Sequence, residues 1–141
     1  MTLTRKAALG VAACAAVFSG TFGTANAAGD LFGAIAVADL GDSWQFGAAW
    51  DTSDQGRADA SALDQCGYTN CVVKLRWVNG CGTVARRDDN LVFATGRNQA
   101  EAERNAMSQL GADPNPLLVS LGSAEPSYAK IVRTHCTANA G

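Results

Sequence analysis

The sequence predicts an α+β fold, a single small domain in which two β-β-α-β-like repeats form an antiparallel sheet with two helices, stapled by disulfides. The repeats span about 31–78 and 81–136, and each begins with a glycine-led strand, GAIA at 33–36 and GTVA at 82–85. Each repeat also carries an alanine-rich segment with helical periodicity between strand-like runs. Because two repeats are too few for an open solenoid, we expect the halves to share one core.

The N-terminus is typical of an export signal. Two basic residues lie near the start, an apolar stretch follows over 7–22, and Ala-Asn-Ala at 25–27 fits the small-x-small rule for signal peptidase. We therefore expect a signal peptide over 1–27 and one secreted domain over 28–141. No later segment approaches the apolar length of a transmembrane helix, so no stable membrane span is expected.

A lipoprotein is the alternative for this N-terminal segment, because Val-Ala-Ala-Cys at 11–14 is similar to a lipidation box with Cys14 as the modified residue. The apolar stretch before Cys14 is short, however, and the residues after it are also apolar, where a lipid tether is usually polar. Cleavage after Ala27 is therefore favoured, which gives a secreted, extracellular protein.

The charge balance argues against nucleic acid as a partner. The chain carries 11 basic and 13 acidic residues. Cleavage would remove two of the basic residues and leave a net charge of −4, with no lysine-rich face and no basic run.

The repeat predicts the order of the elements. In each copy an acidic turn, at 39–42 or 88–90, leads into a second strand, SWQFGAAW or NLVFATG, and then into a helix with apolar residues on one stripe. The stripe residues are Ala58, Ala62, Leu63 and Cys66 in copy one, and Ala102, Ala106, Met107 and Leu110 in copy two. The expected helix caps are Ser53 and Gly67 in copy one, and Asn98 and Gly111 in copy two.

The last strand of each copy is CVVKLRWV at 71–78 or YAKIVRTHC at 128–136. Asn79-Gly80 follows the first of these and lies between two alternating apolar runs, which is a strong signal for a hairpin with a type I′ turn. We therefore expect residues 71–95 to form a three-stranded meander.

Four cysteines remain after the expected signal peptide, and an even number in an exported domain indicates disulfides. Cys66 and Cys71 both lack a counterpart in copy two. Their joint absence from that copy favours a bond between them, which would tie the helix end to the following strand. Cys81 then pairs with Cys136, near the end of the final strand.

Metal and redox sites are disfavoured. Only Cys66 and Cys71 approach the close spacing of zinc ligands, and His135 would have to complete the set. Cys66 also lies at the C-terminal end of its expected helix, where the dipole does not favour a reactive thiolate. We expect no metal and no cofactor.

The sequence predicts no catalytic residue and no enzymatic activity. His135 is the only histidine, no Gly-x-Ser-x-Gly surrounds a serine, and the aspartates lie at expected turns, where their side chains favour the backbone geometry. A weak secreted hydrolase using His135 is the lesser alternative.

The tryptophans are the candidate binding surface. Trp44 and Trp50 lie at an even spacing on one strand, so both point to the same face, and Trp77 lies on another strand. Core packing is the default interpretation for all three. If they are exposed, they form a contact surface for an unknown protein or glycan partner.

Several motifs occur in a fixed order: GAIAVA, SWQFG, RADASALDQCG, CVVKLRW, NGCGTVA and AEAERNAM. In these motifs, over about residues 31–110, the chain resembles the small exported actinobacterial and mycobacterial proteins grouped as domain of unknown function 4189. The resemblance implies export and a disulfide-stapled domain of two copies, and it implies no reaction. The chain departs from the family pattern at Leu110, where members often have a cysteine, and at the insert over 112–127.

Together these observations predict a secreted, disulfide-stabilised, non-enzymatic interaction module that acts at or outside the cell envelope, on a host or envelope protein. An extracellular enzyme inhibitor is the alternative, since a small stapled repeat domain suits the rigid presentation of loops.

Overall fold

The computed structural model describes residues 29–141. The expected signal peptide and the alternative lipidation at Cys14 lie outside the described residues. In chain order, the elements are β1 (Phe32–Asp39), β2 (Trp44–Thr52), α1 (Gln55–Cys66), β3 (Val72–Val78), β4 (Cys81–Arg87), β5 (Asn90–Gly96), α2 (Gln99–Leu110), α3 (Pro116–Ser120) and β6 (Lys130–Cys136).

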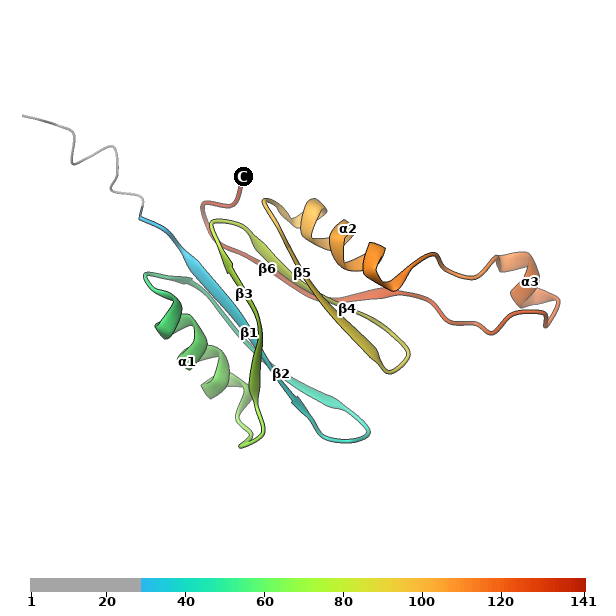
Figure 1. The fold of residues 1–141 in the computed structure, drawn as a ribbon, viewed down its shortest axis with the longest axis horizontal. Helices are drawn as coiled ribbons and strands as arrows, with labels where there is room; N and C mark the ends of the chain where they lie inside the picture. Colours follow the sequence, from blue (N-terminus) through green and yellow to red (C-terminus); the bar gives the residue numbers. More distant parts are fainter. Residues whose placement is uncertain (1–28) are drawn as a thin grey trace, which may run out of the picture.

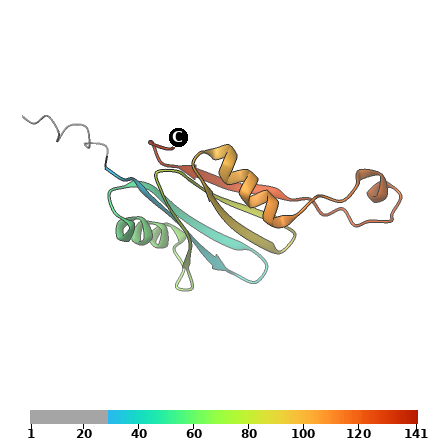
Figure 2. The same cartoon turned by 45° about the horizontal axis from the view of Figure 1, so that its top comes forward.

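The strands form two three-stranded antiparallel sheets, with strand orders β2-β1-β3 and β5-β4-β6. Each sheet comes from one repeat, with the glycine-led strand in its centre. Helices α1 and α2 cover the outer faces of the two sheets (Figure 1), and the inner faces pack against each other. Figure 2 shows the same layers from a second direction. The predicted α+β class and the two repeats are confirmed, with one small sheet for each repeat.

Both acidic turns are hairpin turns. Strands β1 and β2 pair up to Asp39 and Trp44, and strands β4 and β5 pair up to Arg87 and Asn90. Asp88 has a φ of 52°, a left-handed conformation that aspartate tolerates in turns. The two turns lie side by side at one end of the molecule, which we call the loop end (Figure 1).

The expected meander over 71–95 is wrong. Strand β3 pairs with β1, whereas β4 pairs with β5 and β6, so Asn79 and Gly80 carry the chain from one sheet to the other. The Asn79 N–H donates to the Leu31 carbonyl, and the Gly80 carbonyl accepts from the Thr137 N–H. The link is therefore held by the residue before β1 and the residue after β6, while each strand pairs within its own repeat.

Each long helix buries a narrow stripe of residues, mostly alanine, against its own sheet. The buried residues are Ala58, Ala62 and Cys66 in α1, and Ala102, Ala106 and Leu110 in α2. Leu63 was expected in this stripe but is 37% exposed. One residue advances about 100° around a helix, which turns Leu63 away from the face that Ala62 buries.

Three of the four expected helix caps are confirmed. Asn98 accepts from the Glu101 N–H at the start of α2, and Gly67 and Gly111 end the two helices. The assignment of Ser53 is wrong, because its neighbour Asp54 is the N-cap and accepts from the Arg57 N–H at 2.9 Å.

Trp77, near the end of β3, is buried between the two sheets, with only 5% of its surface exposed. Its indole covers Gly33 on β1 and Gly82 on β4, and a methyl group built on either glycine would overlap the ring. Each sheet therefore needs a residue without a side chain at this point. This is why both copies of the repeat begin with glycine.

Both expected disulfides are confirmed, Cys66–Cys71 and Cys81–Cys136. The first ties the end of α1 to the residue before β3. The second joins β4 to β6 at directly paired residues whose Cα atoms are 4.0 Å apart.

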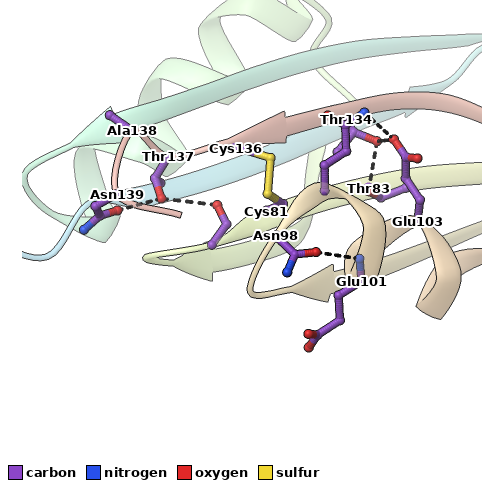
Figure 3. The surroundings of a disulfide bond; sticks show 12 residues. Cys81, Thr83, Asn98, Glu101, Glu103, Thr134, Cys136, Thr137, Ala138 and Asn139 are labelled. Atoms are coloured by element: carbon purple, nitrogen blue, oxygen red, sulfur yellow. Dashed lines mark hydrogen bonds between the residues drawn. A yellow bond between two sulfur atoms is a disulfide. The ribbon is translucent and has the colours of Figure 1, made fainter. Parts of the chain in front are cut away.

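Figure 3 shows that the Cys81–Cys136 bridge lies next to a polar contact between the second sheet and α2. The Thr83 and Thr134 hydroxyls are 3.0 Å apart, and the Thr134 hydroxyl donates to the Glu103 carboxylate at 2.9 Å. The disulfide and these hydrogen bonds hold β4, β6 and α2 together at the same point.

Candidate functional site

A cleft of about 560 Å³ lies at the loop end, and both sheets contribute to it. The β1–β2 and β4–β5 turns form its rim, and the strands that lead from them form its floor. The cleft is lined by Asp42, Ser43, Trp44, Phe46, Arg86, Asp88, Asp89, Leu91 and Val132.

The floor of the cleft is apolar. Half-buried Trp44, Phe46, Leu91 and Val132 all pack against the core cluster between the sheets. The guanidinium of Arg133 on β6 lies 4.7 Å from the centroid of the Phe46 ring, a cation–π contact that joins β6 to β2. A smaller hollow of about 350 Å³ shares Trp44 and Leu91 with the cleft and extends the apolar surface towards β3.

The rim of the cleft is acidic. Asp42 comes from the first turn, and Asp88 and Asp89 come from the second, and all three are exposed. Asp88 also accepts a 2.6 Å hydrogen bond from the Ser127 hydroxyl, while Arg86 is the only basic residue in the lining. Three carboxylates against one guanidinium give the rim a net negative charge, which attracts a cationic group.

The three tryptophans lie in different places. Trp44 lines the cleft, and Trp77 is buried between the sheets. Trp50 lies at the far end of β2 from Trp44, is 41% exposed, and stacks on His135. The tryptophans therefore do not share one exposed surface, and only Trp44 faces the cleft.

His135 lies on β6 away from the cleft, and its ring centroid is 4.1 Å from that of Trp50, with 15° between the ring planes. Burial lowers the pKa of His135 below its ordinary value, and charge repulsion from Arg133 lowers it further. Within the described residues, the ring thus stacks on an indole and lies near a cation that repels its protonated form. This arrangement lacks the oriented carboxylate that a catalytic histidine uses.

We expect the protein to be less stable in mild acid, because the pKa of His135 is lower in the folded protein than in the unfolded chain. The unfolded chain binds a proton on His135 more readily than the folded protein does, so the free energy of unfolding falls as the pH drops below about 6.5. The loss stops once the pH is below the folded pKa. Urea unfolding at about pH 7.5 and about pH 5 measures the effect.

The matched control for this experiment is His135→Phe, which keeps an aromatic ring against Trp50 and cannot titrate. The wild type should lose more stability than this variant between the two pH values. Equal losses in the two proteins would contradict the assignment to His135. Arg133→Met should reduce the wild-type loss, because it removes the repulsion that contributes to the lowered pKa.

Residues 29–141 hold neither a metal-binding cluster nor a membrane-spanning helix. No cluster of three or more histidine, cysteine, aspartate or glutamate side chains in this part of the chain is arranged to bind a metal ion. No helix within the same residues is long and apolar enough to cross a membrane.

Sequence reasoning missed the cleft itself. It assigned Asp42, Asp88 and Asp89 to turns one by one, and did not bring them together. The signal that could have found the cleft is the repeat, because turns at equivalent positions of two face-to-face repeats can lie at the same end. The contacts of Arg87 were also not predicted. Its guanidinium donates to the Asp113 carboxylate at 2.7 Å and to the Gly111 carbonyl at 3.1 Å.

Comparison with known proteins finds mycobacterial relatives. Protein Rv1269c of Mycobacterium tuberculosis and Protein Mb1300c of Mycobacterium bovis are each 40% identical over 87 residues, which is 62% of this chain and 66% of theirs. Uncharacterized protein Rv1813c of M. tuberculosis is 37% identical over 79 residues, 56% of this chain and 52% of its own length. The aligned part of the chain thus spans just under two thirds of the first two relatives and about half of the third.

No solved structure matches the chain significantly. The family described as "Domain of unknown function (DUF4189)" matches residues 32–136, which run from the first residue of β1 to the last residue of β6. With the mycobacterial relatives, this match shows that the chain belongs to the DUF4189 family.

Proposed function

We propose that this protein is an exported, non-enzymatic interaction module that binds a protein partner at or outside the cell envelope through the cleft at the loop end. The observation that carries the proposal is the cleft itself, in which an apolar floor around Trp44 lies directly beneath an acidic rim. The two disulfides support export, because such bonds persist in oxidising compartments outside the cytosol.

The chemistry of the cleft supports binding rather than catalysis. Its lining contains carboxylates, a serine and an arginine but no histidine, cysteine or lysine. The Ser43 hydroxyl donates to the Asp42 carboxylate at 3.3 Å, whereas a nucleophilic serine is typically activated by an adjacent histidine. His135, the only histidine of the sequence, stacks on Trp50 outside the lining.

The cleft also favours one kind of partner. A basic side chain would be attracted to Asp42, Asp88 and Asp89, while an adjacent apolar side chain would cover the Trp44 ring. Arginine and aromatic residues are the side chains that most often dominate the energetics of protein interfaces. A neutral glycan would use the aromatic floor without the net charge of the rim, so the charge favours a protein partner.

A peptide selection tests this proposal with a defined probe. Random peptides displayed on phage would be selected on the oxidised protein, and the best synthetic peptide would be measured by fluorescence anisotropy. We expect the selected peptides to carry arginine or lysine beside a large apolar residue. Their affinity should fall at least about tenfold in Trp44→Ala and in the double variant Asp42→Asn/Asp89→Asn, which corresponds to about 1.4 kcal/mol.

Two control variants match these changes away from the cleft. Trp50→Ala removes the tryptophan at the other end of β2, and Asp64→Asn removes an exposed carboxylate of α1. Both variants should bind the selected peptide as tightly as the wild type does. The affinity of the wild type for the peptide should fall when salt is added. Peptides that bind Trp44→Ala as tightly as the wild type would exclude the cleft as their site, and peptides recovered cleaved would show an enzyme.

A further inference from the structure

An arm formed by residues 112–129 extends from the second sheet, between α2 and β6. It carries the short helix α3, and Figure 1 and Figure 2 both show it projecting along the long axis, away from the rest of the molecule. None of the residues of α3 is buried, and none belongs to the three core clusters. Helix α3 therefore adds nothing to the packing of the core, against which the arm packs only through Ala129 at its base.

The end of the arm is apolar, exposed and uncharged. Leu117 and Leu121 are 63% and 67% exposed, the highest values among the exposed large apolar side chains of the described residues, and Leu118 is 45% exposed. No ionisable side chain occurs between Asp113 and Glu125. Exposed leucines concentrated on a projecting tip are characteristic of a contact surface, whereas single ones scattered over a protein are ordinary.

Most N–H groups of this tip are paired within the tip itself. The N–H groups of Leu121 and Gly122 donate to carbonyls within α3, and those of Ser123 and Ala124 both donate to the Leu118 carbonyl. At the start of the helix, the Asn115 side chain accepts from the Leu117 N–H at 2.9 Å. A segment whose backbone is already paired enters an apolar medium at a much lower cost than an open loop does.

The base of the arm is fixed to the sheet. Arg87 at the end of β4 donates to the Asp113 carboxylate and to the carbonyls of Gly111 and Ala112. On the returning limb, the Ala129 N–H donates to the same Asp113 carboxylate. These contacts hold both limbs at the edge of the domain, so the leucines are presented at a distance from it.

From this geometry we propose that the arm is a membrane-docking element that inserts Leu117, Leu118 and Leu121 into the interfacial region of a lipid bilayer. The uncharged tip matches the apolar layer of a bilayer, and the pairing of most of its N–H groups lowers the cost of entry. A helix-in-groove contact with a protein needs apolar residues over several turns. Helix α3 has only 5 residues, so it offers a single turn. The inference uses no residue of the cleft floor and is independent of the proposed peptide binding.

Quenching of tryptophan fluorescence by brominated acyl chains tests the insertion. The full oxidised chain carrying Leu121→Trp is mixed with vesicles of brominated phosphatidylcholine, and the quenching is measured relative to the wild type. Val78→Trp is the matched control, because Val78 is also exposed, at 48%, but lies on β3 away from the arm. Both chains contain the same N-terminal segment, so any vesicle binding by that segment is common to them.

We expect the additional quenching of Leu121→Trp to be at least about fivefold greater than that of Val78→Trp, because only the arm would reach the acyl chains. Adding Leu117→Asp to Leu121→Trp should remove most of this quenching, since a carboxylate opposes insertion of the tip. Added salt, or phosphatidylglycerol in the vesicles, should change it little. Equal quenching at the two positions, or quenching that requires anionic lipid and disappears in salt, would overturn the proposal.

Discussion

Removing the Cys81–Cys136 disulfide is expected to lower the free energy of unfolding by about 4 kcal/mol. The bond closes a loop with a sequence separation of 55, so the reduced unfolded chain gains a large conformational freedom that the oxidised chain lacks. The bond also holds β4 to β6, in addition to their pairing in the sheet and the Thr83–Thr134 hydrogen bond. The variant Cys81→Ala/Cys136→Ala, unfolded in urea without reductant, measures this loss.

The second disulfide provides the matched control. Cys66–Cys71 has a sequence separation of 5, and the same loop-entropy relation gives about 2 kcal/mol for its removal. Cys66→Ala/Cys71→Ala should therefore unfold at a higher urea concentration than Cys81→Ala/Cys136→Ala. The opposite order would mean that the local closure of α1 onto β3, and not the size of the loop, determines what each bond contributes.

The parts of the fold that were predicted correctly depend on local patterns within each repeat. The alanine stripes of α1 and α2 follow from spacing along one helix, and the pairing of Cys66 with Cys71 follows from their joint absence in copy two. Asn98 is an N-cap because its side chain reaches the Glu101 N–H from the adjacent turn. In each case the deciding contact lies inside one repeat, so the sequence contains the information directly.

The error at Asn79-Gly80 has the opposite cause. These residues have the local signature of a hairpin, and Asn79 does adopt a positive φ of 50°. Strand pairing, however, is decided by the whole apolar surface that a strand buries. β3 pairs with β1 and β4 with β5 and β6, each within its own repeat. A local turn preference is small beside the burial of two complete sheet faces.

The candidate site was not predictable for a related reason. The alternation along β2 placed Trp44 and Trp50 on one face, but it could not tell whether that face meets solvent or a second sheet. In the structure this face of β2 is directed towards the second sheet. Trp44 therefore lies in a cleft, and Trp50 lies against His135 of the other repeat. The rim depends likewise on two turns distant in sequence, at Asp42 and Asp88, meeting at one end. Both results follow from how the repeats pack, which periodicity within one repeat does not determine.

Trp77 is the largest buried side chain in that packing. Truncating it to alanine is expected to cost about 3–5 kcal/mol of folding free energy, the range for losing a large buried aromatic side chain. The indole fills the space between Gly33 and Gly82, so its removal leaves a cavity between the two sheets. Its N–H is buried and has no hydrogen-bond partner within the described residues. Trp77→Phe should therefore cost less than Trp77→Ala, because it retains most of the ring and removes the unpaired donor.

A double-mutant cycle between Trp77 and Gly82 separates this packing from a general intolerance of alanine in β4. In the wild type, Gly82→Ala should cost at least about 1–3 kcal/mol, because the added methyl group overlaps the Trp77 ring and forces the sheets apart. In the Trp77→Ala background the same methyl group enters the cavity, so its cost should disappear or change sign. The two changes should thus couple by about 1–3 kcal/mol. Gly29→Ala, where a methyl group meets open space, is the control and should be neutral in both backgrounds. Additive effects of Trp77→Ala and Gly82→Ala would mean that the glycine is needed for the conformation of β4 and not for contact between the repeats.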